Sequence, residues 1–351
     1  LMGGDTGAAF DVVSAAISAG KPVVTANKAL LARRGAEVLG LLQSGKSAIA
    51  YEAAVAGGIP VIKGLREGLA ANNIRAVYGI LNGTCNFILS EMSATGRAFG
   101  DVLKDAQEKG YAEADPAFDI DGIDAAHKLS ILSGLAFGAL PDVTKITARG
   151  IRYVTSLDID FARELGYRIK LLGIARKTPK GVEQSVEPCL VPSSSPIAAV
   201  EGALNAVYID GDFSGKILMT GAGAGGDATA SAVVADIVDI ARGKTLPLLG
   251  MASPSPAVAG ASLQDRIGSF FLRLVVLDQP GVIADVSAIL RDCAVSLESV
   301  LQRGHAPGKP VPIIFTTHKT PEGAMQKAVK DIANLKTVLE PPHLMRIETF
   351  E

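Results

Sequence analysis

The first 55 residues alternate between helical and strand patterns, and this alternation restricts the fold more than any other feature of the chain. In "TGAAFDVVSAAISAG" (6–20) apolar residues recur at helical spacing, and a glycine ends the run. The run "KPVVTA" (21–26) then reads as a short buried strand, and a second helix follows. This βαβ order predicts a doubly wound α/β sheet. Because the order begins in mid-unit, we expect the chain to be an N-terminally truncated fragment of such a sheet.

Two further units are expected after this one. Residues 56–225 mix helical patterns with alternating apolar runs, which indicates an α+β domain. Residues 246–267 include "GMASPSPAVAGAS" and read as a linker. Residues 268–351 have the order βαββαβ, the ferredoxin-like arrangement. Pro312, in the third strand of this last unit, favours an edge position because proline cannot donate to a neighbouring strand.

Composition excludes several classes of partner and site. The chain of 351 residues has 34 basic and 36 acidic side chains, so no charge asymmetry points to nucleic acid or an anionic membrane. Its apolar runs fall short of the roughly 20 residues that a membrane span needs. The three cysteines lie far apart, which argues against a disulfide framework or a zinc site. A reducing, cytoplasmic setting is therefore expected.

One segment concentrates acidic residues in an otherwise apolar chain. "EADPAFDIDGIDAAHK" (113–128) holds five carboxylates and ends on a lysine. A calcium-binding EF-hand loop is excluded, because aligning Asp119 and Asp121 with its early ligands places Lys128 where a glutamate is essential. A solvated loop stays open as an interpretation. Apolar residues expected to be buried are interleaved with the acids, which favours a polar active site instead: Tyr111, Phe118, Ile120 and Ile123.

The helix that begins near Ile123 gives this segment a specific geometry. It places Asp124 and Lys128 four residues apart, on one helix face. The rest of the helix is apolar nearly all round, which indicates that it is buried. A charged pair at the wall of a buried cleft is costly unless it has a function. We therefore expect Lys128 to transfer a proton, while Glu113 and Asp119 could bind the ammonium group of an amino acid.

Four motifs carry a resemblance to a known family. They are "VVTANKALLA" (23–32), "YEAAVAGGIPVIKGLREGL" (51–69), "GILNGTCNFILSEM" (79–92) and "GYAEADPAFDIDGIDAAHK" (110–128). In this order they resemble homoserine dehydrogenase, and the match runs through essentially the whole chain. The resemblance implies an oxidoreductase that interconverts L-homoserine and L-aspartate 4-semialdehyde with NAD(P). This reaction serves threonine, methionine and isoleucine biosynthesis.

The resemblance also assigns roles to individual residues. Lys128 would be the proton donor and acceptor, and Asp124 would orient substrate or water beside it. Glu113 and Asp119 would hold the substrate amino group, with Thr84 on the other side of the substrate. Residues implied at the cofactor are Lys28, Gly225, Met2 and Gly3. A monovalent cation, usually sodium, is implied between Glu52 and the carbonyls of Val55, Gly57 and Ile59.

The motif "GAGAGG" (221–226) fits a dinucleotide fingerprint but is not expected to be one. The strand that follows its helix ends without the acidic residue that the fingerprint requires. By resemblance, this loop and a helix at about 226–245 return the chain to the partial NAD(P)-binding domain of residues 1–55. The genuine fingerprint would precede residue 1, so whether this chain alone binds cofactor stays open.

The last unit resembles an ACT domain, and "DQPGVIADV" (278–286) looks like that family's first strand-to-helix turn. Such domains bind amino acids, so threonine is an expected regulatory ligand and a homodimer or homotetramer an expected assembly. An alternative is that the chain is an inactive fragment that acts as an amino-acid-binding regulator. His127 is interpreted as structural, and Cys85 as an inert core thiol in a strand and turn.

Overall fold

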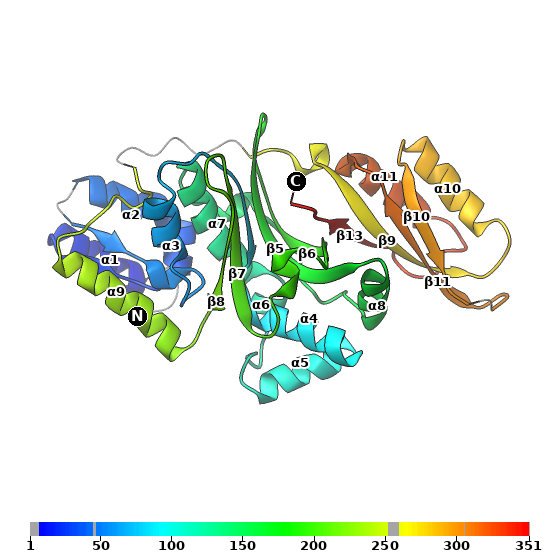
Figure 1. The fold of residues 1–351 in the computed structure, drawn as a ribbon, viewed down its shortest axis with the longest axis horizontal. Helices are drawn as coiled ribbons and strands as arrows, with labels where there is room; N and C mark the ends of the chain where they lie inside the picture. Colours follow the sequence, from blue (N-terminus) through cyan, green and yellow to red (C-terminus); the bar gives the residue numbers. More distant parts are fainter. Residues whose placement is uncertain (1–6, 45–46, 252–259, 305, 351) are drawn as a thin grey trace.

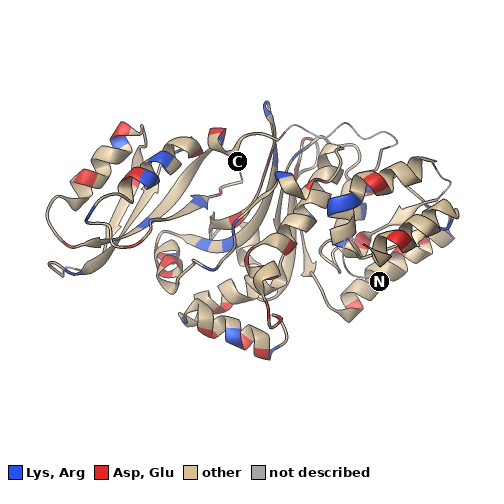
Figure 2. Ribbon diagram, turned by 180° about the vertical axis from the view of Figure 1, so that it is seen from behind, with Lys and Arg blue, Asp and Glu red and all other residues tan. Residues whose placement is uncertain are grey.

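The computed structural model describes residues 7–44, 47–251, 260–304 and 306–350. In this part of the chain the fold is mixed α/β (Figure 1), with a two-stranded sheet near the N-terminus and an eleven-stranded sheet that runs through the rest. Figure 2 shows acidic and basic positions interspersed along the helices. Among the described helices, none combines the length and the apolar character that a membrane crossing would require.

The N-terminal part has the βα alternation that the sequence predicted. Two helices, α1 (Ala8–Ser18) and α2 (Lys28–Ser44), alternate with the short strands β1 (Val23–Val24) and β2 (Ile49–Ala50). The two strands pair in parallel, which requires a crossover such as α2 between them. Helix α9 (Gly226–Ala241), from much later in the sequence, contacts both β1 and the short helix η1 (Glu52–Ala54).

The central part is an antiparallel sheet with helices on one face. Its strand order is β6–β5–β3–β7–β8, and the short β4 pairs with the outer side of β6. Helices α4, α7 and α8 pack against these strands and enclose the main core. The strands are β3 (Ile74–Ile80), β4 (Thr147–Ala148), β5 (Tyr167–Thr178), β6 (Gly181–Pro192), β7 (Leu204–Gly211) and β8 (Gly215–Ala222). The helices are α3 (Val61–Lys63), η2 (Gly64–Gly68), α4 (Gly83–Thr95), α5 (Phe99–Glu108), α6 (Ala117–Ile120), α7 (Ile123–Phe137), η3 (Val143–Lys145), α8 (Ser156–Glu164) and η4 (Pro196–Ala199).

The C-terminal part has the predicted element order and its own core. Its strands are arranged β10–β11–β9–β13, and β13 also pairs in parallel with β6, so the two sheets are continuous. Its elements are η5 (Leu263–Asp265), β9 (Ile267–Leu277), α10 (Val282–Asp292), β10 (Leu297–Gln302), β11 (Pro310–Thr317), β12 (Thr320–Pro321), α11 (Glu322–Ile332) and β13 (His343–Ile347). This continuity fixes the C-terminal part against the central sheet.

Two local predictions were wrong. Pro312 was expected at a sheet edge, but β11 lies between β10 and β9. The strand tolerates it because β10 pairs only with Ile313 and later residues, which leaves Pro312 opposite β9 alone. Cys85 was expected in a strand and turn, but it lies in the first turn of α4. A short apolar run does not by itself distinguish a strand from a buried helix.

Candidate active site

The buried carboxylate of Asp124 is the centre of the candidate site. Asp124 lies in the first turn of α7 and is 4% exposed. Its Oδ2 accepts a hydrogen bond of 2.8 Å from the Nζ of Lys128, one helical turn later. Its Oδ1 lies 3.2 Å from the Nζ of Lys28, at the start of α2. One carboxylate thus joins two lysines that are 100 residues apart in the sequence.

Local backbone geometry allows α7 to begin and end where it does. Gly122 precedes the helix with φ +82° and Gly138 follows it with φ +66°, a conformation that glycine adopts at little cost. Between them the helix packs against α2, β3 and β5. This packing leaves only 12% of the Lys128 side chain exposed, and its Nζ donates a second bond of 2.7 Å to the Leu81 carbonyl.

Asn82 connects the helix start of α4 to two acids. Its Oδ1 accepts a hydrogen bond from the backbone N–H of Cys85, which makes it the N-cap of α4. Its Nδ2 donates to Asp119 Oδ1 at 2.8 Å and to Asp124 Oδ2 at 2.9 Å. Asn82 lies within one of the four family motifs, but no role was predicted for it from the sequence. The signal was present, since asparagine is a preferred N-cap.

The buried Asp124 and the partly buried Asp119 have opposite electrostatic tendencies. Burial opposes ionisation of Asp124, but the charges of Lys128 and Lys28 outweigh it and lower the pKa of Asp124 to about 2. Burial raises the pKa of Asp119, and the nearby charge of Asp124 adds to this rise. Among the described residues, no lysine or arginine forms an ion pair with Asp119. Its negative charge therefore depends mainly on neutral hydrogen-bond donors.

Thr84 and Lys28 complete the cluster. Thr84 Oγ1 donates to the Tyr111 carbonyl at 2.6 Å and lies 3.3 Å from Asp119 Oδ2. Lys28 is about one-third exposed and lies 6.0 Å from the ring centre of Phe118. These contacts bring five predicted site residues into one group: Lys28, Thr84, Asp119, Asp124 and Lys128.

The acidic segment (113–128) contains both exposed and buried side chains. Glu113 is exposed, and no described residue forms an ion pair or a side-chain hydrogen bond with its carboxylate. Asp121 is about one-third exposed and pairs with Arg152. The expected burial of the interleaved apolar residues was mostly wrong, because only Ile120 is buried, whereas three are more than one-third exposed: Tyr111, Phe118 and Ile123. Part of the segment is therefore a solvated loop, and part lines a polar cluster.

His127 and Cys85, which are close to the cluster residues in the sequence, have surroundings typical of structural residues. His127 is buried, and its ring meets that of Phe118 edge to face at 5.5 Å. Cys85 is fully buried, and burial raises the pKa of its thiol well above the usual value. A thiol with a raised pKa stays protonated and is a poor nucleophile.

The glycine loop at 221–226 packs against the loop at 55–59. The N–H of Gly58 donates to the Ala222 carbonyl at 2.9 Å, and a Cβ on Gly57 would stand 2.8 Å from the Gly223 carbonyl. Position 57 therefore needs glycine for this close backbone contact. Gly225 opens α9 with φ +114°, and no described atom lies within 4 Å of where its Cβ would stand.

One of the four residues implied at a cation, Glu52, is a buried carboxylate. Glu52 is 3% exposed, and its two oxygens accept backbone N–H bonds of 2.9 Å from Ile62 and Lys63. Burial raises the pKa of Glu52 to about 7, despite these bonds. No described residue donates a hydrogen bond to the carbonyls of Val55 or Gly57, whereas the Ile59 carbonyl accepts from the N–H of Val61. Among the described residues, no group of three or more His, Cys, Asp or Glu could hold a metal ion.

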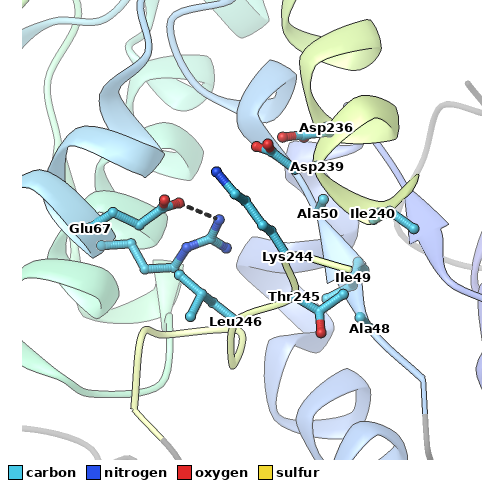
Figure 3. A pocket seen from close by; sticks show the side chains of 11 residues that line it. Ala48, Ile49, Ala50, Glu67, Asp236, Asp239, Ile240, Lys244, Thr245 and Leu246 are labelled. Atoms are coloured by element: carbon cyan, nitrogen blue, oxygen red, sulfur yellow. Dashed lines mark hydrogen bonds and ion pairs between the residues drawn. The ribbon is translucent and has the colours of Figure 1, made fainter. Parts of the chain in front are cut away.

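A small polar pocket lies apart from the lysine and aspartate cluster, between α9 and η2 (Figure 3). Charged side chains from η2, from α9 and from the segment after α9 line this pocket. None of the five clustered residues is among them. The charged lining residues are Arg66, Glu67, Asp236, Asp239 and Lys244. Met2 and Gly3, implied at the cofactor, lie outside the described residues.

Comparisons with known proteins agree on one family. The family model for homoserine dehydrogenase matches residues 60–238. The homoserine dehydrogenase of Neisseria gonorrhoeae is 48% identical over 358 residues, which cover 100% of this chain and 82% of that protein. The homoserine dehydrogenase of Pseudomonas aeruginosa is 46% identical, over 99% of this chain and 82% of that protein.

Solved structures give the same result. The crystal structure of a homoserine dehydrogenase from Thiobacillus denitrificans matches with a TM-score of 0.92 and 45% identity, over 100% of this chain and 81% of that one. A hyperthermophilic archaeal homoserine dehydrogenase, solved in complex with NADPH, matches with a TM-score of 0.58 and 31% identity, over 67% of this chain and 68% of that one.

The lowered pKa of Asp124 predicts a pH-dependent contribution to stability. A carboxyl with a pKa of about 2 in the fold, against an ordinary 3.8, stabilises the fold above pH 4 by about 2 kcal/mol. This contribution is lost as the pH falls toward 2. We expect Asp124→Asn to lower the free energy of unfolding in urea by about this amount at pH 7, and by clearly less at pH 3. Asp121→Asn is the matched control, since its pair with Arg152 is exposed; an equal loss at both pH values for Asp124→Asn would contradict the interpretation.

Proposed function

The chain belongs to the homoserine dehydrogenase family and is an oxidoreductase, and from this we propose that it interconverts L-homoserine and L-aspartate 4-semialdehyde with NAD(P). The proposed biological role is in threonine, methionine and isoleucine biosynthesis, in the cytoplasm. The single observation that supports the proposal best is the position of Lys128. Its amine lies in a largely buried cluster, held between Asp124 and the Leu81 carbonyl.

Lys128 is the proposed proton donor and acceptor. An ammonium group has three N–H donors. Two of them are used by Asp124 and the Leu81 carbonyl, which leaves one for the alcohol or aldehyde oxygen of the substrate. Proton transfer at this oxygen is general acid–base catalysis, which typically contributes a factor of about 10²–10⁴. Asp124 fixes the amine in place and balances its charge.

The substrate amino group is proposed to bind at the acidic side of the cluster. The side-chain amide of Asn82 connects Asp119 to Asp124. The hydroxyl of Thr84 lies 3.3 Å from the other carboxylate oxygen of Asp119. An ammonium group there would supply the cation that Asp119 lacks among the described residues. Glu113 is proposed to contribute from the exposed loop, on the solvent side of the same group.

The residues on the cofactor side fit a nicotinamide dinucleotide. The start of the 16-residue helix α9 is open at Gly225, and helix N-termini attract phosphate and other anionic groups. Lys28 is about one-third exposed and pairs with Asp124, and it is proposed to lie between cofactor and substrate. NAD(P), when bound, supplies the hydride chemistry at the carbon that carries the oxygen. Gly225 and Lys28 are the described residues proposed to hold it, and Met2 and Gly3 are proposed at its edge.

We propose the finer organisation as well. The proposed units are a partial NAD(P)-binding domain at 1–55 with a return helix at about 226–245, a catalytic domain at 56–225, a linker at 246–267, and an ACT domain at 268–351. A homodimer or homotetramer is the proposed assembly.

A monovalent cation, sodium in particular, is proposed at Glu52 with the carbonyls of Val55, Gly57 and Ile59. A buried carboxylate and two carbonyls without hydrogen bonds among the described residues suit a hard cation. We expect NaCl, compared with equal choline chloride, to raise the Tm by about 2–4 °C for about 1 kcal/mol of binding. Glu52→Gln should remove this difference, whereas Glu67→Gln, an exposed acid, should keep it. A sodium effect that survives in Glu52→Gln would exclude this site.

A second candidate function, amino-acid binding by the C-terminal unit, is favoured by a pocket at the turn between β9 and α10. Its lining includes Gln279, Gly281, Ala284 and Gln302. We expect calorimetry of the full-length protein to detect binding of threonine, and Ala284→Trp to abolish it by filling the pocket. Arg291→Trp, exposed on the same helix, is the control and should bind normally. Absence of any threonine-dependent heat in the parent protein would count against this candidate.

The proton-transfer role predicts a large effect of one substitution. Lys128→Ala should reduce NADP-dependent oxidation of homoserine in the full-length protein by a factor of about 10²–10⁴ or more, while the fold remains. Lys104→Ala, which removes an exposed lysine, should leave the rate unchanged. Steady-state rates of Lys128→Ala within tenfold of the parent would overturn the assignment.

A further inference from the structure

We propose that Asn82 is a positioning residue, which keeps Asp119 and Asp124 side by side as two carboxylates and thereby maintains the binding site for the substrate ammonium group. This inference rests on the proposed function and adds a residue to which no role has been assigned. It starts from the three hydrogen bonds of one buried side chain, which connect the start of α4 to both acids.

The amide of Asn82 can adopt only one orientation. Its Oδ1 accepts from the backbone N–H of Cys85 at 2.8 Å, while its Nδ2 donates to Asp119 and Asp124. The reverse orientation would place an acceptor oxygen against two carboxylates and a donor against a backbone N–H. Since Asn82 is 5% exposed, water does not readily replace any of these bonds. The helix cap therefore aims both donor hydrogens at the acids.

The two acids depend on this amide to different degrees. Asp124 has two cationic partners, Lys28 and Lys128. Asp119 accepts a hydrogen bond from Asn82 and lies 3.3 Å from the Thr84 hydroxyl, while the charge of Asp124 opposes its ionisation. Loss of the Asn82 donors should therefore affect Asp119 first.

The other groups around Asp119 do not compensate for such a loss. From α7, Asp124 raises the pKa of Asp119, and the more distant charge of Lys128 lowers it. From α4, the thiol of Cys85 contacts the backbone carbonyl of Asp119, not its carboxylate. Lys28, from α2, pairs with Asp124 instead.

A protonated Asp119 would bind an ammonium group poorly, because it would offer no charge and would present a competing donor. Loss of the Asn82 donors should thus weaken homoserine binding at low pH and leave proton transfer by Lys128 largely intact. The effect should appear in KM for homoserine more than in kcat, and it should diminish as the pH rises.

The test separates the amide donors from the helix cap. Asn82→Ser keeps a side-chain oxygen that can cap α4 but removes the NH₂ group. Asn82→Asp also keeps the cap and adds a third carboxylate beside the other two. Thr155→Ala removes the cap of α8, whose hydroxyl bonds to Asp158 and to none of the clustered residues, and is the matched control for loss of helix stability.

In the full-length protein, we expect the acid limb of kcat/KM for homoserine to move to higher pH by about one unit in Asn82→Ser, which is about tenfold at a fixed acidic pH. Asn82→Asp should move it further. KM for NADP should stay within about twofold of the parent in both, and Thr155→Ala should not move the limb. An unchanged limb in both Asn82 variants, or an equal loss for homoserine and NADP, would overturn the proposal.

A second readout does not require turnover. Carboxyl ¹³C NMR titration should show the pKa of Asp119 raised in Asn82→Ser relative to the parent. If Asp119 titrates identically in both, the proposal is wrong even where the parent oxidises homoserine. If the parent does not oxidise homoserine but the Asp119 pKa rises in the variant, the proposed function fails and the electrostatic role of Asn82 stands.

Discussion

The buried negative charge of Asp124 is the interaction on which the arrangement of the site depends. A carboxylate this deeply buried is unfavourable unless cations and donors surround it. Its partners come from three separate parts of the chain: Lys28 at the start of α2, Asn82 before α4, and Lys128 within α7. Because Lys28 comes from α2 while Asn82 and Lys128 come from the central part, this one charge links the N-terminal βα unit to the central sheet.

A second set of buried charges fixes the C-terminal unit. Arg266 is 2% exposed and lies 2.7 Å from Glu187 on β6 and 2.6 Å from Glu322 at the start of α11. This pair of contacts lies beside the parallel pairing of β13 with β6. Close to the same joint, the N–H of Ile151 donates to the Ile120 carbonyl within the acidic segment. The C-terminal unit is therefore attached to the central sheet by buried ion pairs and strand pairing at β6.

Only part of the structure of the acidic segment could be predicted from its local sequence. The pairing of Asp124 with Lys128 follows from a helical period of 3.6 residues, and the apolar surroundings of α7 follow from its composition, so both could be predicted. The inward direction of Asp119 and the outward direction of Glu113 could not, because both acids are flanked by residues of similar polarity. The direction of Asp119 is set by contacts with Asn82 and Thr84, which lie 37 and 35 residues earlier in the chain.

The sequence by itself determined the βα alternation at the start, the βαββαβ order at the end, the lysine–aspartate pair, and the motifs that identify the family. These depend on periodicity and on residue order, which are local properties of the chain. Only the tertiary structure decided that Lys28 shares Asp124, that Asn82 joins two acids, and that β13 extends the central sheet beside β6. Such contacts depend on how whole elements pack. The free energy of that packing is distributed over many residue pairs that no short stretch of sequence contains.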